Sequence, residues 1–183
     1  MSVEIAANAS LVISAAPFAY PAPEVDSRET MLSVFTPELD DFAAATRVAE
    51  RITISAGISL QTAPVVISGG RGVGSPEGFA SLEAFAELVG GAVGCSRVVT
   101  NQGWRPHSDQ VGQTGKRVAP ELYIACGISG AIQHWIGMQA SQRVLAINLD
   151  KDAPMVTKAD YAVIGDLHEI VPAIVEELRK RRG

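Results

Sequence analysis

The sequence predicts an α/β fold in which a parallel sheet carries helices on both faces. Two observations lead to this prediction. Short apolar runs typical of buried strands alternate with longer amphipathic segments typical of helices, and the order repeats along residues 64–183. The 183 residues are also 47% hydrophobic and 19% charged, a composition that can bury a proper core.

The first third of the chain carries weaker signals. Residues 31–35 are expected to form a strand. Residues 37–54 begin with a fair helix start, yet their later part alternates between apolar and polar residues like an edge strand. We therefore divide the chain into residues 1–63, with a linker and edge strands, and a main domain at residues 64–183.

The main domain contains a regular series of strands and helices. Strands are expected at residues 65–67, 92–96, 98–100, 122–126, 144–149 and 161–164. The first helix should start with Ser75 as N-cap and Pro76 in its first turn, and end at Gly90–Gly91. Further helices are expected after Ser129 and at residues 167–179.

Polar and glycine-rich segments follow several of these strands. In parallel sheets, ligands bind at the carboxyl ends of the strands. Gly69–Gly72 follows a strand, so its backbone N–H groups could approach an anion, and Arg71 adds a fixed positive charge. The spacing is not the G-x-G-x-x-G of a dinucleotide fingerprint. A plain tight turn therefore remains an alternative interpretation.

The run Gln110–Lys116 alternates glycines with polar side chains. Such a composition suits a backbone wrapped closely around a polar ligand. A Walker A loop needs four residues between its first Gly and the Gly-Lys pair, and then Ser or Thr. Here two residues separate Gly112 from Gly115, and Arg117 follows Lys116. The run does not predict an ATPase, and taken alone it is equally compatible with a surface turn.

Composition also limits which binding partners and which cellular compartment are expected. The net charge is −5, which predicts no nucleic-acid partner. No apolar run approaches the ~18 residues of a membrane span, and the first residues do not resemble a signal peptide. Cys95 and Cys126 form no metal-binding or CxxC pattern. We interpret both as reduced core residues of a cytoplasmic protein.

Candidate catalytic groups do not emerge from spacing alone. His107–Asp109 is contiguous, which is the wrong arrangement for a triad assembled in space. Arg97 alone is compatible with a surface residue, and a lone helical histidine such as His134 is more often structural than a ligand contact.

Five separated segments occur in an order that resembles the carboxyl-terminal FAD-binding domain of the electron-transfer flavoprotein alpha subunit. They are residues 66–72, 94–97, 110–116, 127–134 and 146–148. Asp166–Leu167 matches the next family element, so the resemblance covers about residues 64–178. It implies a Rossmann-like fold, of the deoxyhypusine-synthase-like NAD/FAD-binding type, with FAD as cofactor.

The resemblance also implies a set of FAD contacts. They are Arg71, Ser96, Arg97, Val111, Gly112, Gln113, Thr114, Ser129, Gly130, Ala131, Ile132, Gln133, His134, Asn148, Asp166 and Leu167. Arg97, Thr114 and His134 would lie around the isoalloxazine. His134, as a cationic or donor group, would face the pyrimidine edge, where negative charge collects on reduction.

The other end of the cofactor has its own implied contacts. Ser129 and the helix start after it would serve the pyrophosphate. Asn148 and Asp166 would hold the adenosine end. Fixed cations and donors suit a charge that develops only in the reduced flavin.

The function implied by the resemblance is that of an electron carrier and not of an enzyme. The chain would form a heterodimer with a beta subunit, accept electrons from flavin dehydrogenases such as the acyl-CoA dehydrogenases of fatty acid beta-oxidation, and deliver them to a quinone oxidoreductase. A non-redox nucleotide-binding module on the same fold and a subunit of an electron-bifurcating complex are the alternatives.

The sequence departs from the family pattern in three places. The family alpha subunit has a whole amino-terminal domain, of which residues 1–63 would be a remnant. Asn101 stands where the family usually has an acid, and Leu149 replaces a frequent Lys. The flavin contacts implied above are unaffected, but docking to the beta subunit is placed in doubt.

Overall fold

The computed structural model describes residues 32–36 and 58–182. Residues 1–57 and 58–183 form two separate units. Residues 32–36 have no regular secondary structure, and Leu32, Val34 and Phe35 are more than four-fifths exposed. The strand predicted at residues 31–35 is therefore wrong over its described part, because a strand requires a partner for its backbone N–H and C=O groups. The edge strand expected late in residues 37–54 lies outside the described residues.

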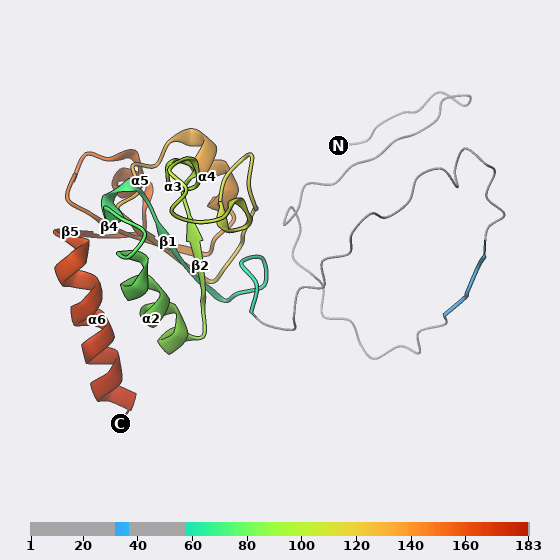
Figure 1. Cartoon of the computed structure of the whole chain (residues 1–183), viewed down its shortest axis with the longest axis horizontal. Helices are drawn as coiled ribbons and strands as arrows, with labels where there is room; N and C mark the ends of the chain where they lie inside the picture. Colours follow the sequence, from blue (N-terminus) through green and yellow to red (C-terminus); the bar gives the residue numbers. More distant parts are fainter. Residues whose placement is uncertain (1–31, 37–57, 183) are drawn as a thin grey trace. The chain divides into compact units, whose positions relative to one another are not determined.

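The second unit is built on a five-stranded sheet with the order β2-β1-β3-β4-β5. All neighbouring strands are parallel. The strands are β1 (Val65–Gly69), β2 (Ala92–Cys95), β3 (Leu122–Cys126), β4 (Arg143–Asn148) and β5 (Tyr161–Ile164). Figure 1 shows them as neighbouring arrows with helices around them. The predicted α/β fold with a Rossmann-like parallel sheet is confirmed.

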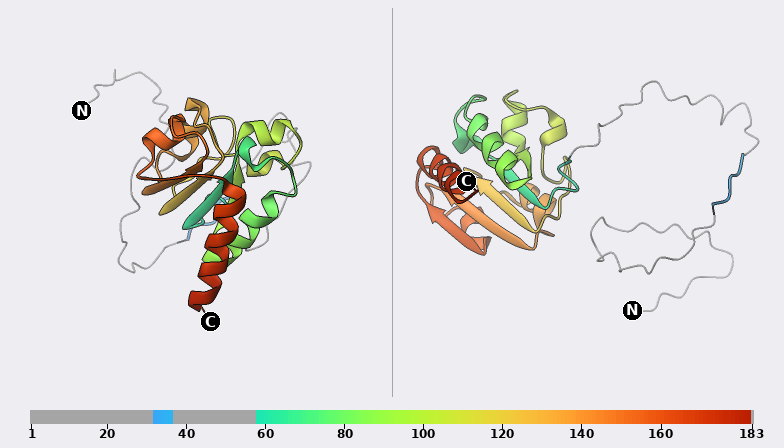
Figure 2. Two further views of the ribbon diagram at one scale, coloured as in Figure 1. Left: turned by 90° about the vertical axis from the view of Figure 1, so that its left-hand side faces the viewer. Right: turned by 90° about the horizontal axis from the view of Figure 1, so that it is seen from below.

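Helices cover both faces of this sheet (Figure 2). On one face, α2 (Phe79–Val89) and α6 (Leu167–Arg182) pack side by side over apolar strand residues such as Ile67 and Ile124. On the other face, α4 (Ile132–Met138) and α5 (Pro154–Lys158) cover residues that include Val66 and Tyr123. Adjacent strand residues enter different cores because side chains alternate between the faces of a sheet.

The start of α2 differs from the prediction. The helix begins at Phe79, and residues 76–78 form a preceding turn in which Phe79 N–H donates to the Pro76 carbonyl at 3.2 Å. Ser75 still accepts a bond, from the Gly78 N–H at 3.3 Å. A side chain at Gly78 would lie 2.5 Å from the Val73 carbonyl, so the turn before the helix requires glycine at this position.

Two further elements differ from the sequence prediction. The predicted strand at residues 98–100 belongs to the helix α3 (Arg97–Asn101). The chain turns at Ser96, whose carbonyl accepts the Val99 N–H at 3.0 Å, and this turn overrides the strand preference of two valines. The short helix α5 was not predicted, although Pro154 in its first turn is a favoured position.

Within residues 32–36 and 58–182, no helix has the length and apolar character needed to cross a membrane.

Candidate functional site

The site begins where the loops after β1 and β3 touch. The chain runs from β1 to β2 on one side and then returns to β3 on the other, which makes β1/β3 a topological switch point, where ligands of such sheets bind. The Gly70 N–H donates to the Cys126 carbonyl at 2.8 Å, and the Gly72 N–H donates to the Gly127 carbonyl at 3.1 Å. A side chain at Gly70 or Gly72 would overlap the Gly127 backbone. Glycines are therefore needed for this contact.

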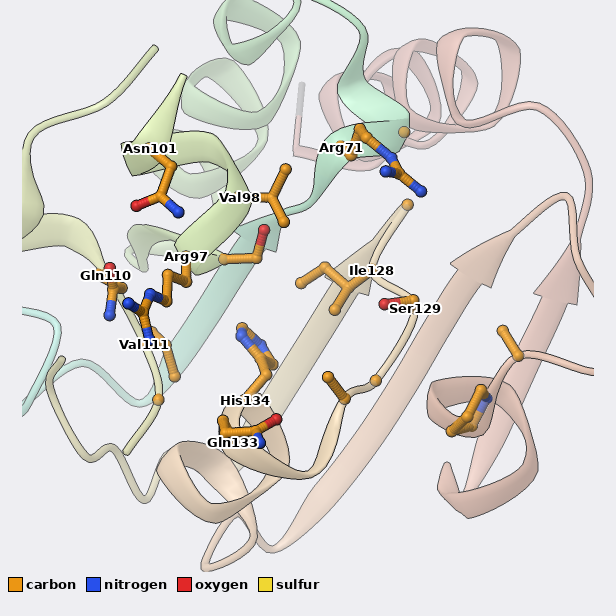
Figure 3. Close-up of a pocket in the computed structure, with 18 of the residues that line it drawn as sticks. Arg71, Arg97, Val98, Asn101, Gln110, Val111, Ile128, Ser129, Gln133 and His134 are labelled. Atoms are coloured by element: carbon orange, nitrogen blue, oxygen red, sulfur yellow. The ribbon is translucent and has the colours of Figure 1, made fainter. Parts of the chain in front are cut away.

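A cavity of about 650 Å³ opens at this edge of the sheet. Its size falls within the range of roughly 300–1,000 Å³ typical of small-molecule sites. It is lined by the segments that follow β1, β2, β3 and β4, and by the loop from Gln110 to Thr114 (Figure 3).

Most residues that the resemblance implied line this one cavity. They are Arg71, Ser96, Arg97, Val111, Gly112, Gln113, Thr114, Ser129, Gly130, Ala131, Gln133, His134 and Asn148. These residues come from four strand ends and from the loop at residues 110–114, and the fold brings them together because parallel strands end at the same edge.

The other three implied residues lie outside the cavity. Ile132 is the first residue of α4 and is 55% exposed. Asp166 is exposed, and its Oδ1 accepts from the backbone N–H of His168 at 2.9 Å. Leu167 begins α6 and is buried in the core that α2 and α6 cover.

Several lining residues were not among those predicted. They are Gly72, Val98, Asn101, Gln110, Gly127, Ile128, Asp150, Ala153 and Pro154. Gly72, Gln110, Gly127 and Ile128 stood inside the motif segments and were within reach of the same reasoning. Val98 and Asn101 belong to α3, where a strand was expected at residues 98–100. Asp150, Ala153 and Pro154 lie between the end of β4 and the start of α5, a helix that was not expected.

Two arginines supply the positive charge of the cavity. Arg71 follows β1 and Arg97 begins α3, and in Figure 3 they lie at different ends of the site. Neither forms an ion pair with any residue that the structure describes. Asp150 is the acidic residue of the lining. Unpaired guanidinium groups beside a cavity favour a ligand with negative charge.

The loop between β2 and β3 is held by Gln110, which is only 2% exposed. Its Nε2 donates to Thr114 Oγ1 at 2.9 Å, and its Oε1 lies 2.8 Å from Thr100 Oγ1 in α3. The amide thus links the helix to the loop and holds the Thr114 hydroxyl in place. Asn148 acts similarly elsewhere, because its Nδ2 donates to the Ile128 carbonyl at 3.0 Å.

His134 is the buried titratable group of the site. Its Nε2 lies 2.9 Å from the Tyr123 hydroxyl, and its Nδ1 has no hydrogen-bond partner among the described residues. Burial lowers the pKa of His134 to about 4, and the Val111 backbone opposes this shift only in part. The ring is therefore neutral near pH 7. Of the two roles expected for it, the donor role is available and the cationic role is not.

The residues present fit a flavin dinucleotide on three grounds. The cavity has the size of a cofactor site, two unpaired arginines face it, and the orphaned Nδ1 of His134 needs a partner that a ligand carbonyl oxygen would supply. Within the described residues, no group of three or more His, Cys, Asp or Glu is placed to bind a metal ion.

Comparison with known proteins finds the same family as the sequence motifs. Residues 59–139 match the electron transfer flavoprotein FAD-binding domain. Electron transfer flavoprotein subunit alpha from Thermoanaerobacterium thermosaccharolyticum is 50% identical over 123 residues, which are 67% of this chain and 37% of the relative. The subunit from Mycobacterium tuberculosis is 52% identical over 119 residues, 65% of this chain and 37% of the relative. The one from Paracoccus denitrificans is 50% identical over 131 residues, 72% of this chain and 42% of the relative.

The resemblance to the FAD-binding domain of the electron transfer flavoprotein alpha subunit is thereby confirmed. The chain spans about two fifths of the length of the curated relatives it matches.

Proposed function

We propose that this relative of the electron transfer flavoprotein alpha subunit binds FAD in the cavity at the β1/β3 switch point and carries electrons. One observation carries the proposal. Of the residues that the family pattern assigns to FAD, all except Ile132, Asp166 and Leu167 line a single cavity of about 650 Å³. Such convergence from separated segments is not expected of a set of unrelated surface turns.

The charges and donors suggest how the cofactor is held. Arg71 and the glycine loop beside it would bind the pyrophosphate together with Ser129, since backbone N–H groups and a guanidinium both favour phosphate oxygens. Asn148 would hold the adenosine end, with Asp166 beyond the cavity. Arg97, Thr114 and His134 would surround the isoalloxazine.

Bound FAD would supply reversible one- and two-electron chemistry, and the protein would tune it. The guanidinium of Arg97 would stabilise negative charge that develops on the reduced ring. His134, neutral and buried, contributes an N–H dipole instead. Thr114 adds a hydroxyl whose position is held by Gln110.

The partners follow from the family. We propose that a beta subunit completes the flavin site in a heterodimer. Flavin dehydrogenases, such as acyl-CoA dehydrogenases, would donate electrons, and a quinone oxidoreductase would accept them.

The proposal is tested by titrating the chain, with and without a beta subunit, with FAD and with FMN. FAD should bind more tightly, because FMN lacks the pyrophosphate and adenosine that Arg71 and Asn148 would hold. No FAD binding even with the beta subunit, or equal affinity for FMN, contradicts the proposal. Tighter binding of ATP than of FAD favours a non-redox nucleotide-binding module.

The variant Arg71→Ala tests the assignment of the pyrophosphate contact. Loss of a charge-assisted hydrogen bond should cost roughly 1.5–3 kcal/mol of binding free energy, so the Kd for FAD should rise by about 10-fold to 150-fold. Arg143→Ala is the matched control, because Arg143 begins β4 at the opposite edge of the sheet. An Arg71→Ala variant with the affinity of the control places Arg71 outside the phosphate site.

A further inference from the structure

A buried hydrogen bond lies behind the cavity. The Tyr123 hydroxyl and His134 Nε2 are 2.9 Å apart. Tyr123 lies in β3 with no exposed surface, and His134 lies in α4 with 6% of its surface exposed. The two rings meet edge to face, with centroids 6.1 Å apart and planes at 62°. This bond joins a central strand to the ring that lines the cavity.

Both partners of this bond are neutral near pH 7. Burial lowers the pKa of His134 to about 4 and raises the pKa of Tyr123 above its usual range. The imidazole therefore has one N–H, and the phenol keeps its proton. Two arrangements satisfy the bond. Either Tyr123 donates to a bare Nε2, or an Nε2–H donates to the tyrosine oxygen.

The hydrogen bonds favour the first arrangement. Among the described residues the Tyr123 hydroxyl bonds only to His134, so in the second arrangement its buried proton would be unpaired. Two neighbours agree with this direction. The Ser68 hydroxyl lowers the pKa of Tyr123 against the larger effect of burial, which a hydroxyl does by donating toward the phenolic oxygen. The Val111 backbone raises the pKa of His134, which a carbonyl does by favouring a ring N–H. Because Nε2 faces Tyr123, a ring proton on Nδ1 leaves Nε2 bare to accept from the tyrosine hydroxyl.

Neither neighbour completes a full hydrogen bond. Ser68 Oγ and His134 Nδ1 are both buried without a partner in hydrogen-bond geometry among the described residues. The Nδ1–H group therefore remains available to a ligand oxygen. A buried donor left unpaired is costly, so a ligand that pairs with it gains affinity.

We propose that Tyr123 is a positioning residue of the site, whose hydroxyl holds the His134 ring in place and keeps the ring proton on Nδ1 as a neutral donor for a flavin carbonyl oxygen. The last part of this statement rests on the proposed function. The tautomer itself is a property of the chain without a ligand. A neutral donor also behaves differently from an imidazolium, because its contribution does not change between about pH 5.5 and 8.5.

The test uses nitrogen NMR of the histidine rings in ¹⁵N-histidine-labelled protein without FAD. The chain has three histidines, and loss of signals in His134→Asn assigns those of His134. Ring nitrogen shifts distinguish the Nδ1–H tautomer, the Nε2–H tautomer and the imidazolium. Tyr123→Phe removes only the hydroxyl, and Tyr161→Phe is the matched control because Tyr161 is 63% exposed.

The wild type and Tyr161→Phe should show one Nδ1–H tautomer that does not titrate between about pH 5.5 and 8.5. Tyr123→Phe should show both tautomers in exchange, and its Kd for FAD should rise about threefold to tenfold. An Nε2–H tautomer or an imidazolium near pH 7 in the wild type overturns the proposal. So does an unchanged tautomer in Tyr123→Phe.

Two safeguards keep the test decisive. If Tyr123→Phe does not fold, Ser68→Ala takes its place. This variant should also raise the share of the Nε2–H tautomer of His134. An unchanged tautomer in Ser68→Ala contradicts the proposal that Ser68 donates toward Tyr123 and Tyr123 donates to His134. If the wild type binds no FAD, the proposed function fails, whereas the spectra without FAD still decide the role of Tyr123.

Discussion

At the scale of single residues, His168 in α6 links this helix to the turn at residues 71–73, which follows β1. Its Nδ1 lies 2.8 Å from Asp166 Oδ1, and its Nε2 lies 3.1 Å from the Val73 carbonyl. A carboxylate and a carbonyl can only accept, so both ring nitrogens must carry protons to make both bonds. The Asp166 carboxylate, and after it the Val73 backbone, raise the pKa of His168 above its ordinary value of 6.5.

This arrangement predicts a pH dependence of stability. Because the folded state holds the proton more tightly, the contribution of His168 is fully present below about pH 6.5 and is lost as pH rises through the raised pKa. The pKa of Asp166 is lowered by its bonds to His168, so its own contribution is lost only in acid. Urea midpoints of the wild type should fall relative to those of His168→Asn between about pH 6 and 9. Parallel pH profiles for the two proteins contradict this linkage.

At the scale of elements, the packing of α4 against the loop at residues 110–116 shapes the site. A side chain at Gly137 would overlap the Gly112 backbone, so the glycine lets the helix touch the loop. Two bonds secure this contact. The Gln113 N–H donates to the Gln133 carbonyl and the Val118 N–H to the Gly137 carbonyl, both at 2.8 Å. The loop and the helix therefore act as one support for Thr114 and His134.

Gly137→Ala should break this support. Although alanine favours a helix by about 1 kcal/mol over glycine, overpacking against backbone costs roughly 1–3 kcal/mol. We expect the free energy of unfolding to fall by up to about 2 kcal/mol and FAD affinity to weaken with it. Urea unfolding measures the first effect. Gln139→Ala, at the exposed end of the same helix, is the control and should be close to neutral. Equal stability of the two variants would contradict this expectation, because it would mean that the Gly112 backbone moves aside at little cost in free energy.

The elements were predicted to different degrees. The strands predicted at residues 65–67, 122–126 and 161–164 are present, the first extending to Gly69, because short apolar runs bounded by turn residues are local signals. Residues 98–100 were not, since valines favour a strand locally while the turn at Ser96 directs the chain into α3. The missed lining residues Val98 and Asn101 follow from that one error.

At the scale of the whole molecule, both cysteines lie in the core that α2 and α6 cover. Cys95 in β2 and Cys126 in β3 are both register partners of Gly69 in β1. Strand β1 therefore lies between the two cysteines. Both have no exposed surface. Burial raises the pKa of each thiol to about 12. They are poorly placed for a disulfide and hold almost no thiolate near pH 7.

Their reactivity should therefore report global unfolding. In the native protein, a thiol reagent should label each cysteine no faster than the protein unfolds. In urea, both cysteines should react at the same rate. Mass spectrometry of samples quenched at intervals measures the two sites separately. Rapid labelling of one cysteine without loss of the fold contradicts the prediction and identifies a local opening at that strand end.

By itself, the sequence determined the fold class and the segments that form the site. Apolar runs, turn glycines and the spacing of motifs such as residues 66–72 and 110–116 are local properties that need no neighbour in space. The tertiary structure decided which of these segments meet. The strand order, the link from Gln110 to Thr114 and the bond from Tyr123 to His134 join residues on separate elements. Such contacts depend on which strand lies beside which and on how tightly helices and loops approach, and no local pattern carries that information.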